Sequence, residues 1–327
     1  MKIKNIAFIG NFVAPESTEN HLKWTLEDLG YKVIGLQENI DTTDHILDVA
    51  KACDLLIYVH THGWFTPGTF DLTELFNRLK SLKIPTASFH LDYWFGLTRQ
   101  DDVGKHPFWH TKYVFTADGG SNNWYREQGI NHFWLKPAVV KRDCYMAEKH
   151  SDYDLIFVGS NLYHNEWDYR PQLINWLKMN YGGRFRRFGN PDFTDDSVFP
   201  VRGRPLNQLY ADAKVVVGDS LCLNFTHEDY WSDRVYETIG RGGFLIHPYI
   251  KGLEKEFVDG ETIVFYKFGD FDELKTKINY YIENDEAREK IRKQGFEFVR
   301  NNATYNDRMD EMIGKITAME NKEKKNA

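Results

Sequence analysis

Short apolar runs alternate with stretches of helical periodicity along the first part of the chain. Residues 3–10 form an apolar run, residues 17–30 open with a helix N-cap signal and close on a glycine, and residues 31–36 are apolar again. This order predicts a strand, a helix and a strand, which is one βαβ unit. The same alternation predicts further strands at 53–60, 84–90, 113–118 and 132–137, and helices at 71–82 and 122–128. Such a pattern is typical of a parallel sheet covered on both faces.

A second series of the same kind follows a polar, charged segment at about 138–152. It predicts strands at 154–160, 184–189, 214–220 and 262–267 and helices at 169–179 and 206–213, with helix from 270 to a polar tail. A length of 327 residues also favours two domains. We therefore expect an α/β protein of two Rossmann-like lobes whose parallel sheets face each other across a cleft. The expected division is 1–145, 146–305, and a C-terminal helix and tail at 306–327.

Charge and cysteine content limit the partners and the compartment. The formal net charge of −7 and the pI near 6.0 give no overall positive field toward nucleic acid or an anionic membrane. Cys53, Cys144 and Cys222 are too scattered for a disulfide framework or a zinc site and are expected to be packing residues. The first apolar run is too short for a signal peptide, and no run is long enough to cross a membrane. We expect a cytoplasmic protein, in the host cytoplasm if it is viral, without a membrane partner.

Two predicted strands end in a glycine before a helix, an arrangement that offers backbone N–H groups and a helix dipole to an anion. The motifs are "FIGN", with Gly10 and Asn11, and "FVGS", with Gly159 and Ser160. Neither is a complete GxGxxG, and "GRGG" at 240–243 lies at the end of a predicted helix, so a dinucleotide-dependent dehydrogenase is disfavoured. A tight turn without a ligand is the simpler interpretation of either glycine.

The segment "DRVYETIGRGGFLIHP" at 233–248 places charges on a predicted helix directly before a Gly-Gly pair and an apolar strand. Arg234, Glu237 and Arg241 share one helical face, so a ladder of ion pairs is the simplest explanation. The apolar flanks leave little room for an exposed ladder. In the alternative interpretation, the Glu237 carboxylate accepts both ribose hydroxyls of a nucleotide while Arg234 binds a phosphate.

The sequence from 233 to 309 resembles the carboxyl lobe of GT-B glycosyltransferases, and most of all the spore-maturation-type proteins with a family 1-type donor domain. The resemblance rests on R-x-x-E in a helix, a small-residue turn, an apolar strand and the later "DGETIVFYKF" and "NNATYNDRM" segments. It extends weakly to "DLIFVGSNLYHNEWDYRPQLINWL" at 154–177. It implies a GT-B fold and a nucleotide-sugar donor, with uridine the expected nucleotide, bound mainly by the second lobe.

The resemblance also implies roles for individual residues of the second lobe. Glu237 matches the glutamate that holds the ribose, and Asp229 stands where related retaining enzymes have the first glutamate of an E-x7-E motif. Aspartate is one methylene shorter, which puts its reach in question. Gly159 and Ser160 match the turn near the diphosphate. Arg170 and Arg234 supply charge there.

The first lobe is expected to supply the acceptor site and a base. Polar side chains follow its predicted strands in "THGWF", "FHLDYWFG" and "FTADGGSNNW". The ionisable candidates are His62, His90, Asp92 and Asp118, each of which has a structural histidine or a capping aspartate as its simpler interpretation. Gly10 and Asn11 form the acceptor-side turn.

No metal and no cofactor beyond the nucleotide-sugar co-substrate are expected. Arginines and a glycine turn at the diphosphate provide the positive site that a metal provides in other transferases. The D-x-D of Asp270 and Asp272 opens a predicted helix and is interpreted as its N-terminal cap.

These observations predict a hexosyl- or pentosyltransferase with a hydroxyl acceptor. A hydroxymethylated DNA base is one candidate acceptor, as for phage DNA-modifying enzymes, since aromatic residues at strand ends can stack a flipped base and "GGRFRRFG" is locally basic. A glycan or a small molecule is the other. A non-catalytic nucleotide-sugar-binding protein and a nucleotide-sugar epimerase remain as alternatives.

Overall fold

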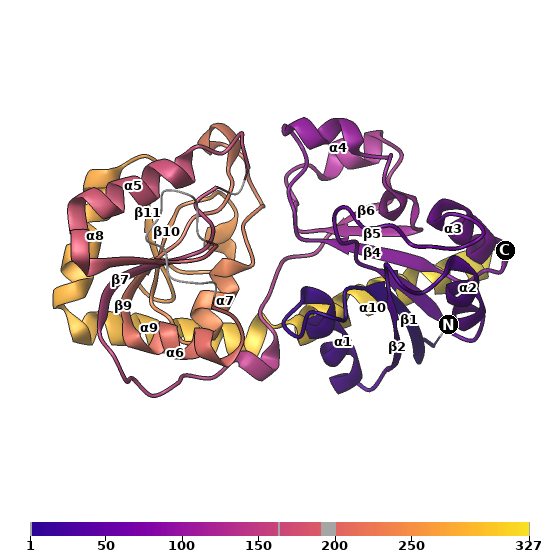
Figure 1. Cartoon of the computed structure of the whole chain (residues 1–327), viewed down its shortest axis with the longest axis horizontal. Helices are drawn as coiled ribbons and strands as arrows, with labels where there is room; N and C mark the ends of the chain where they lie inside the picture. Colours follow the sequence, from indigo (N-terminus) through magenta and orange to yellow (C-terminus); the bar gives the residue numbers. More distant parts are fainter. Residues whose placement is uncertain (1, 163, 191–200, 327) are drawn as a thin grey trace. The chain divides into compact units, whose positions relative to one another are not determined.

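The computed structural model describes residues 2–162, 164–190 and 201–326, and it divides into two compact units (Figure 1). The first unit contains Met1–Lys136 and Tyr305–Ala327, and the second contains Pro137–Thr304. The chain therefore enters the second unit once and returns to the first with its last helix. Among the helices of the described residues, none has the length and apolar character that a membrane crossing needs.

The first unit is built on a six-stranded parallel sheet with strand order β2-β1-β3-β4-β5-β6. Its middle strands are almost wholly buried, because apolar side chains project from both faces. The strands are β1 (Asn5–Gly10), β2 (Lys32–Gln37), β3 (Leu55–Tyr58), β4 (Thr86–His90), β5 (Tyr113–Thr116) and β6 (His132–Trp134).

Helices cover both faces of this sheet. They are α1 (Thr18–Asp28), α2 (Thr43–Lys51), α3 (Leu72–Ser81), α4 (Asn122–Glu127) and α10 (Tyr305–Asn326). The strand order reverses at β1, and right-handed crossovers then place α1 on the face opposite α2 and α3. The contacts agree, since α1 packs against α10 and α2 packs against α3. The reversal creates a topological switch point between β1 and β3, where ligands of open α/β sheets bind.

The second unit has a five-stranded parallel sheet with strand order β11-β10-β9-β7-β8. Its switch point lies between β7 and β9. The strands are β7 (Tyr153–Val158), β8 (Phe185–Phe188), β9 (Ala213–Val217), β10 (Leu245–Pro248) and β11 (Val264–Tyr266).

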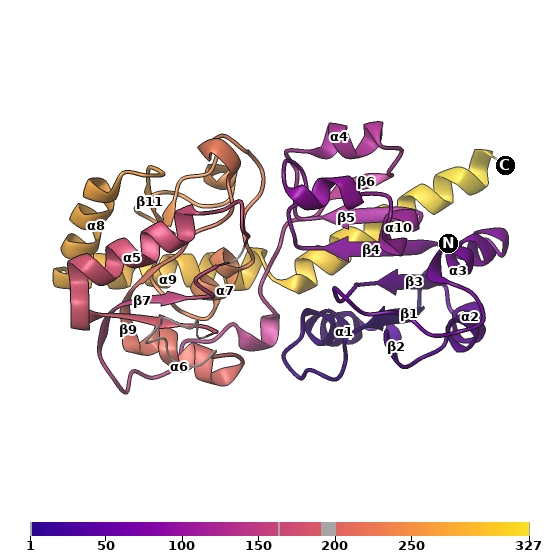
Figure 2. The same cartoon turned by 45° about the horizontal axis from the view of Figure 1, so that its top comes forward.

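Helices again cover both faces, as Figures 1 and 2 show for the second unit. They are α5 (Tyr169–Tyr181), α6 (Arg204–Asp212), α7 (Arg234–Gly240), α8 (Phe271–Glu283) and α9 (Asp285–Asn302). The ring of Trp176 in α5 stacks on Phe271 in α8, and α7 packs along α9, so these two pairs occupy opposite faces. Asp270 caps α8 by accepting a hydrogen bond from the backbone N–H of Glu273, which confirms the predicted cap.

The fold agrees with the predicted class and adds two features. Helix α2 is not among the expected elements, although Thr43, Ile46 and Ala50 form its buried face. The first unit ends at Lys136, earlier than the expected boundary at 145, and α10 packs with that unit instead of standing apart as a tail. The three cysteines are free and buried, as expected for packing residues.

Candidate functional site

A pocket of about 270 Å³ opens in the second unit at the carboxyl ends of β7, β8 and β9. It therefore lies at the switch point of this sheet. Four of the predicted donor residues line it, namely Gly159, Ser160, Arg170 and Arg234.

Two glycines face each other at the floor of this pocket. Gly159 follows β7, and its N–H donates to the carbonyl of Phe188 over 2.8 Å. A Cβ added to Gly189 would stand 2.0 Å from the carbonyl oxygen of Gly159, so only glycine fits there. Arg187 secures the turn, since it is buried and its Nη1 donates to the Gly159 carbonyl over 2.8 Å. Backbone at this turn can therefore approach a ligand closely.

Arg170 reaches the pocket from the first turn of α5 and is held by a buried carboxylate. Its Nε donates to Oδ1 of Asp219 over 2.8 Å, and the indole N–H of Trp167 donates to Oδ2 over 2.9 Å. The Asp219 side chain has no exposed surface. A fixed guanidinium of this kind binds an anion at a low entropic cost.

Arg234 and Glu237 form the ion pair that the simpler interpretation of their helix predicts. Arg234 Nη1 lies 3.0 Å from Oε2 of Glu237, and Arg241 lies 3.8 Å from Oε1. Burial opposes the charge of Arg234, but Glu237, Tyr210 and Asp233 together outweigh burial and raise the pKa of the guanidinium. Arg234 and Thr238 line the pocket, whereas Glu237 between them does not. Glu237 thus lies beside the pocket, and its negative charge is balanced by Arg234 and Arg241.

Asp229 lies outside the pocket lining. Its backbone has a φ of +54°, and its Oδ1 is 3.3 Å from the ammonium of Lys255. Its N–H donates to the carbonyl of Lys251. Asp229 therefore contacts the loop after β10 through Lys251 and Lys255.

Several pocket residues are absent from the sequence prediction, among them Asp219, Asp233 and His247. Burial and the nearby Glu237 raise the pKa of Asp233, and burial lowers the pKa of His247 to about 4. His247 Nε2 lies 3.0 Å from the Ser220 hydroxyl. The signal for Asp219 was present, because "GDS" directly follows the apolar run that becomes β9.

The predicted ionisable residues of the first unit separate into two environments. His62 and Asp92 approach each other at the ends of β3 and β4, with Nε2 and Oδ2 3.4 Å apart, and Asp92 also lies 3.6 Å from Arg99. Both side chains are partly exposed. His90 and Asp118 are buried instead.

The buried residues His90 and Asp118 each make a contact typical of a structural role. The His90 ring packs on Phe108 with centroids 3.7 Å apart, and burial lowers the pKa of His90 to about 3. Asp118 accepts a hydrogen bond from the N–H of Ser121 at the start of α4. The structure thus places His62 with Asp92 and sets His90 and Asp118 in the interior.

A further titratable group in the first unit escaped the sequence analysis. Glu38 follows β2 and is fully buried, and its Oε1 accepts hydrogen bonds from the Tyr58 hydroxyl, over 2.8 Å, and from Nδ1 of His60. The N–H of Thr61 donates to Oε2 over 2.7 Å. His60 directly follows the apolar run "DLLIYV", which is the signal that could have identified it.

The predicted turn at Gly10 and Asn11 connects β1 to α1. The Asn11 carbonyl accepts from the Ser17 hydroxyl, and a Cβ at Gly10 would meet Glu19 of α1 at 2.6 Å. Burial raises the pKa of Glu19. The turn is packed closely against the start of α1.

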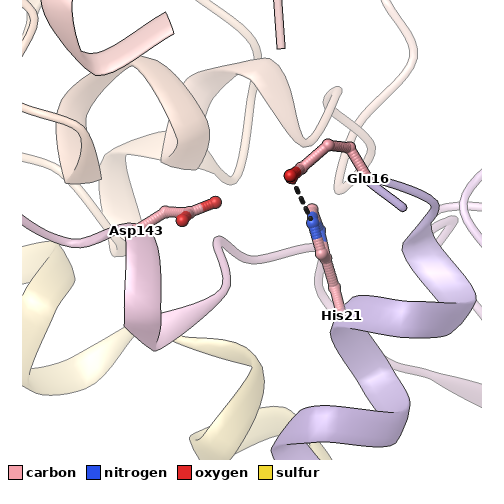
Figure 3. Close-up of side chains that lie close together, drawn as sticks. All are labelled: Glu16, His21 and Asp143. Carbon is pink, nitrogen blue, oxygen red and sulfur yellow. Dashed lines mark hydrogen bonds and ion pairs between the residues drawn. The ribbon is translucent and has the colours of Figure 1, made fainter. Parts of the chain in front are cut away.

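Two ion pairs involve the side chains of Figure 3. His21 of α1 points toward Glu16, with Nε2 and Oε2 3.3 Å apart. Asp143, drawn in the same figure, belongs to the second unit, where it pairs with the buried Arg241. Asn207 also donates to the Asp143 carbonyl, and these contacts anchor the segment before β7 to α6 and α7.

Comparison with known proteins gives a consistent picture of the fold. Residues 170–314 match the model of a family described as glycosyl transferase-like. No curated protein is significantly similar in sequence.

Three solved structures illustrate the likeness. HepE from Anabaena in complex with UDP and glucose is 13% identical, with a TM-score of 0.62 over 96% of this chain and 100% of that one. Sucrose-phosphate synthase from Thermosynechococcus elongatus is 11% identical, with a TM-score of 0.64 over 97% and 100%. An alpha-glucosyltransferase in complex with UDP-glucose and DNA containing an abasic site is 11% identical, with a TM-score of 0.68 over 96% and 99%. The chain has the GT-B fold.

Proposed function

We propose that the protein is a glycosyltransferase that moves a hexose or pentose from a uridine diphosphate sugar to a hydroxyl acceptor. The observation that carries the proposal is the second-unit pocket, where a glycine turn, Arg170 and Arg234 gather at the switch point of a parallel sheet. The glycosyl transferase-like match over residues 170–314 supports it, as do the UDP complexes of proteins with the same fold.

The diphosphate would bind at the glycine turn. Backbone N–H groups at Gly159 and Ser160 and the guanidinium groups of Arg170 and Arg234 are donors of the type that binds phosphate oxygens. When the bond between the anomeric carbon and the phosphate oxygen breaks, the oxygen keeps the electron pair, and these groups stabilise the developing charge. The acceptor oxygen forms the new bond to the anomeric carbon.

Glu237 would exchange its ion pair for a ligand. On donor binding, Arg234 turns to the diphosphate and the Glu237 carboxylate accepts the ribose hydroxyls, with Arg241 still 3.8 Å away to balance its charge. Asp229 would contact only the sugar of the donor and not the nucleotide, because its carboxylate lies outside the pocket, beside Lys255.

The acceptor would be bound by the first unit. A hydroxymethylated DNA base, a glycan and a small alcohol all present a hydroxyl, and partly exposed aromatic rings such as Phe95, which packs edge-on against Trp124, could stack against any of them. DNA is included because an alpha-glucosyltransferase of the same fold is found in complex with DNA.

The test combines donor binding with turnover. Calorimetric titration of UDP and UDP-sugars should show binding, and activity should persist in EDTA because arginines and backbone N–H groups replace a metal. Mass spectrometry of hydroxymethylated DNA, oligosaccharides and small alcohols after incubation should show one added sugar. Donor binding without any sugar transfer would favour a non-catalytic nucleotide-sugar-binding protein. Conversion of the donor to its epimer without an acceptor would favour an epimerase, and loss of activity in EDTA with rescue by Mg²⁺ would contradict the metal-free mechanism.

A further inference from the structure

Four histidines gather at the carboxyl edge of the first-unit sheet. We call His60, His62, His90 and His106 the histidine cluster. The ring of His60 lies 5.7 Å from that of His62 and 5.8 Å from that of His106, measured between centroids. His60 follows β3, next to the switch point between β1 and β3. It therefore occupies the part of the sheet where ligands of this fold bind.

A buried carboxylate holds His60. Glu38 has no exposed surface and is surrounded by three hydrogen-bond donors, the Tyr58 hydroxyl, the Thr61 N–H and Nδ1 of His60. Burial and the nearby Glu38 raise the pKa of Tyr58, so its hydroxyl remains a donor. These donors satisfy the buried carboxylate and fix its position beside His60.

The hydrogen bonds select the tautomer of His60. A carboxylate accepts hydrogen bonds, so Nδ1 carries a proton that faces Glu38, and the lone pair of a neutral imidazole in this tautomer lies on Nε2. Within the described part of the chain, Nε2 makes no hydrogen bond, and only 6% of the side chain is exposed. The ring is thus fixed in orientation with a basic nitrogen left for a ligand.

The other predicted bases are less suited to take a proton. His90 is buried against Phe108, and its pKa is lowered to about 3 because burial disfavours the charged ring. His62 is more than half exposed, and its partner Asp92 is shared with Arg99. His60 alone among the cluster has a buried carboxylate at its second nitrogen.

We propose that Nε2 of His60 removes the proton of the acceptor hydroxyl while Glu38 orients the ring and stabilises the imidazolium. The proposal rests on the proposed glycosyltransferase function. The acceptor O–H bond breaks and its proton goes to Nε2, the oxygen bonds to the anomeric carbon, and the nucleotide diphosphate leaves with the electron pair. The imidazolium then releases the proton to water, so the cycle needs no further reactant.

The test separates turnover from donor binding. His60→Ala should lower kcat by a factor on the order of 10²–10⁴ and leave the affinity for UDP unchanged, because the donor pocket is in the other unit. Added imidazole should restore part of the lost turnover. Glu38→Gln, which keeps the shape and removes the charge, should lower kcat by about tenfold to a hundredfold with an unchanged acceptor KM. His45→Ala, at an exposed histidine of α2, is the matched control and should match the wild type.

Three outcomes would overturn the assignment. They are wild-type turnover in His60→Ala, a loss that imidazole does not reduce, and a larger loss in Asp92→Asn than in His60→Ala. UDP binding and circular dichroism report whether each variant folds, and His60→Gln replaces His60→Ala if the latter does not. If the wild-type protein binds no nucleotide sugar and transfers none, the proposed function fails. If it transfers sugar and His60→Ala transfers equally well, only the role of His60 fails.

Discussion

The two sheets present different chemistry at equivalent edges. In the second unit the switch point gathers glycines and arginines around an open pocket, with Asp219 fixing Arg170. In the first unit it gathers four histidines, one of which, His60, is held by the buried Glu38. In both units an acidic residue orients a basic one, and in our proposals the second edge binds the diphosphate while the first takes up the acceptor proton. The same topology thus presents two different sets of chemical groups, which are determined by the side chains that follow each strand.

The largest effect expected on donor binding disrupts the proposed anion site of the second unit. Gly189→Ala places a Cβ 2.0 Å from the Gly159 carbonyl, so the backbone of the glycine turn must move. We expect the affinity for UDP to fall by about a hundredfold, roughly 2.7 kcal/mol, in calorimetric titration. Gly183→Ala is the control, because its added Cβ meets nothing within 4 Å and binding should stay unchanged. Equal affinities of both variants would show that the turn does not bind the diphosphate.

The next prediction tests whether the Glu237 carboxylate binds the donor or only pairs with Arg234. If its carboxylate accepts the ribose hydroxyls, Glu237→Ala should weaken donor affinity by about one to two orders of magnitude, since each charge-assisted bond contributes roughly 1.5–3 kcal/mol. Glu237→Gln should lose less. If only the 3.0 Å pair with Arg234 matters, donor affinity stays constant and the melting temperature falls slightly.

A smaller effect distinguishes two adjacent arginines of β8. Arg187 is buried and donates to the Gly159 carbonyl, whereas Arg186 is exposed. Arg187→Ala should reduce UDP affinity by about tenfold, about 1.4 kcal/mol, because the turn loses its support. Arg186→Ala should leave it unchanged. If Arg186 instead contacts DNA, its replacement should flatten the salt dependence of DNA binding without affecting UDP.

The last effect concerns stability rather than binding, and it tests the histidines of the first unit through their response to pH. Burial lowers the pKa of His90 to about 3, below its ordinary value of 6.5, so the unfolded chain takes up a proton that the folded protein does not. The free energy of unfolding is therefore unaffected by His90 above pH 6.5. Between pH 6.5 and pH 3 this residue lowers it by about 1.4 kcal/mol per pH unit. Chemical denaturation at pH 5, 6 and 7 should show a shallower decline for His90→Gln than for the wild type. His45→Gln should keep the wild-type slope, and an unaltered slope in His90→Gln would place the pH dependence elsewhere.

The sequence was a good guide to the fold because apolar strands, capped helices and terminal glycines are local signals. "FVGS" and the helix with Arg234 could be located in this way, and both contribute to the pocket. The Glu38–His60 pair could not, because the two residues are separated by a helix in sequence and meet only through the strand order β2-β1-β3. The inward direction of Arg187 was equally hidden, since β8 gives no alternation that separates it from Arg186.

The return of the chain to its first unit has a consequence for biosynthesis. All of Pro137–Thr304 leaves the ribosome before α10, so the first unit cannot be completed until the second has been made. At roughly 5–20 residues per second this delay is on the order of ten seconds. During that time the face of α1 that α10 will cover is open to solvent and to chaperones. The second unit, continuous in sequence, is free to fold first, and the first unit matures last although its synthesis begins earlier.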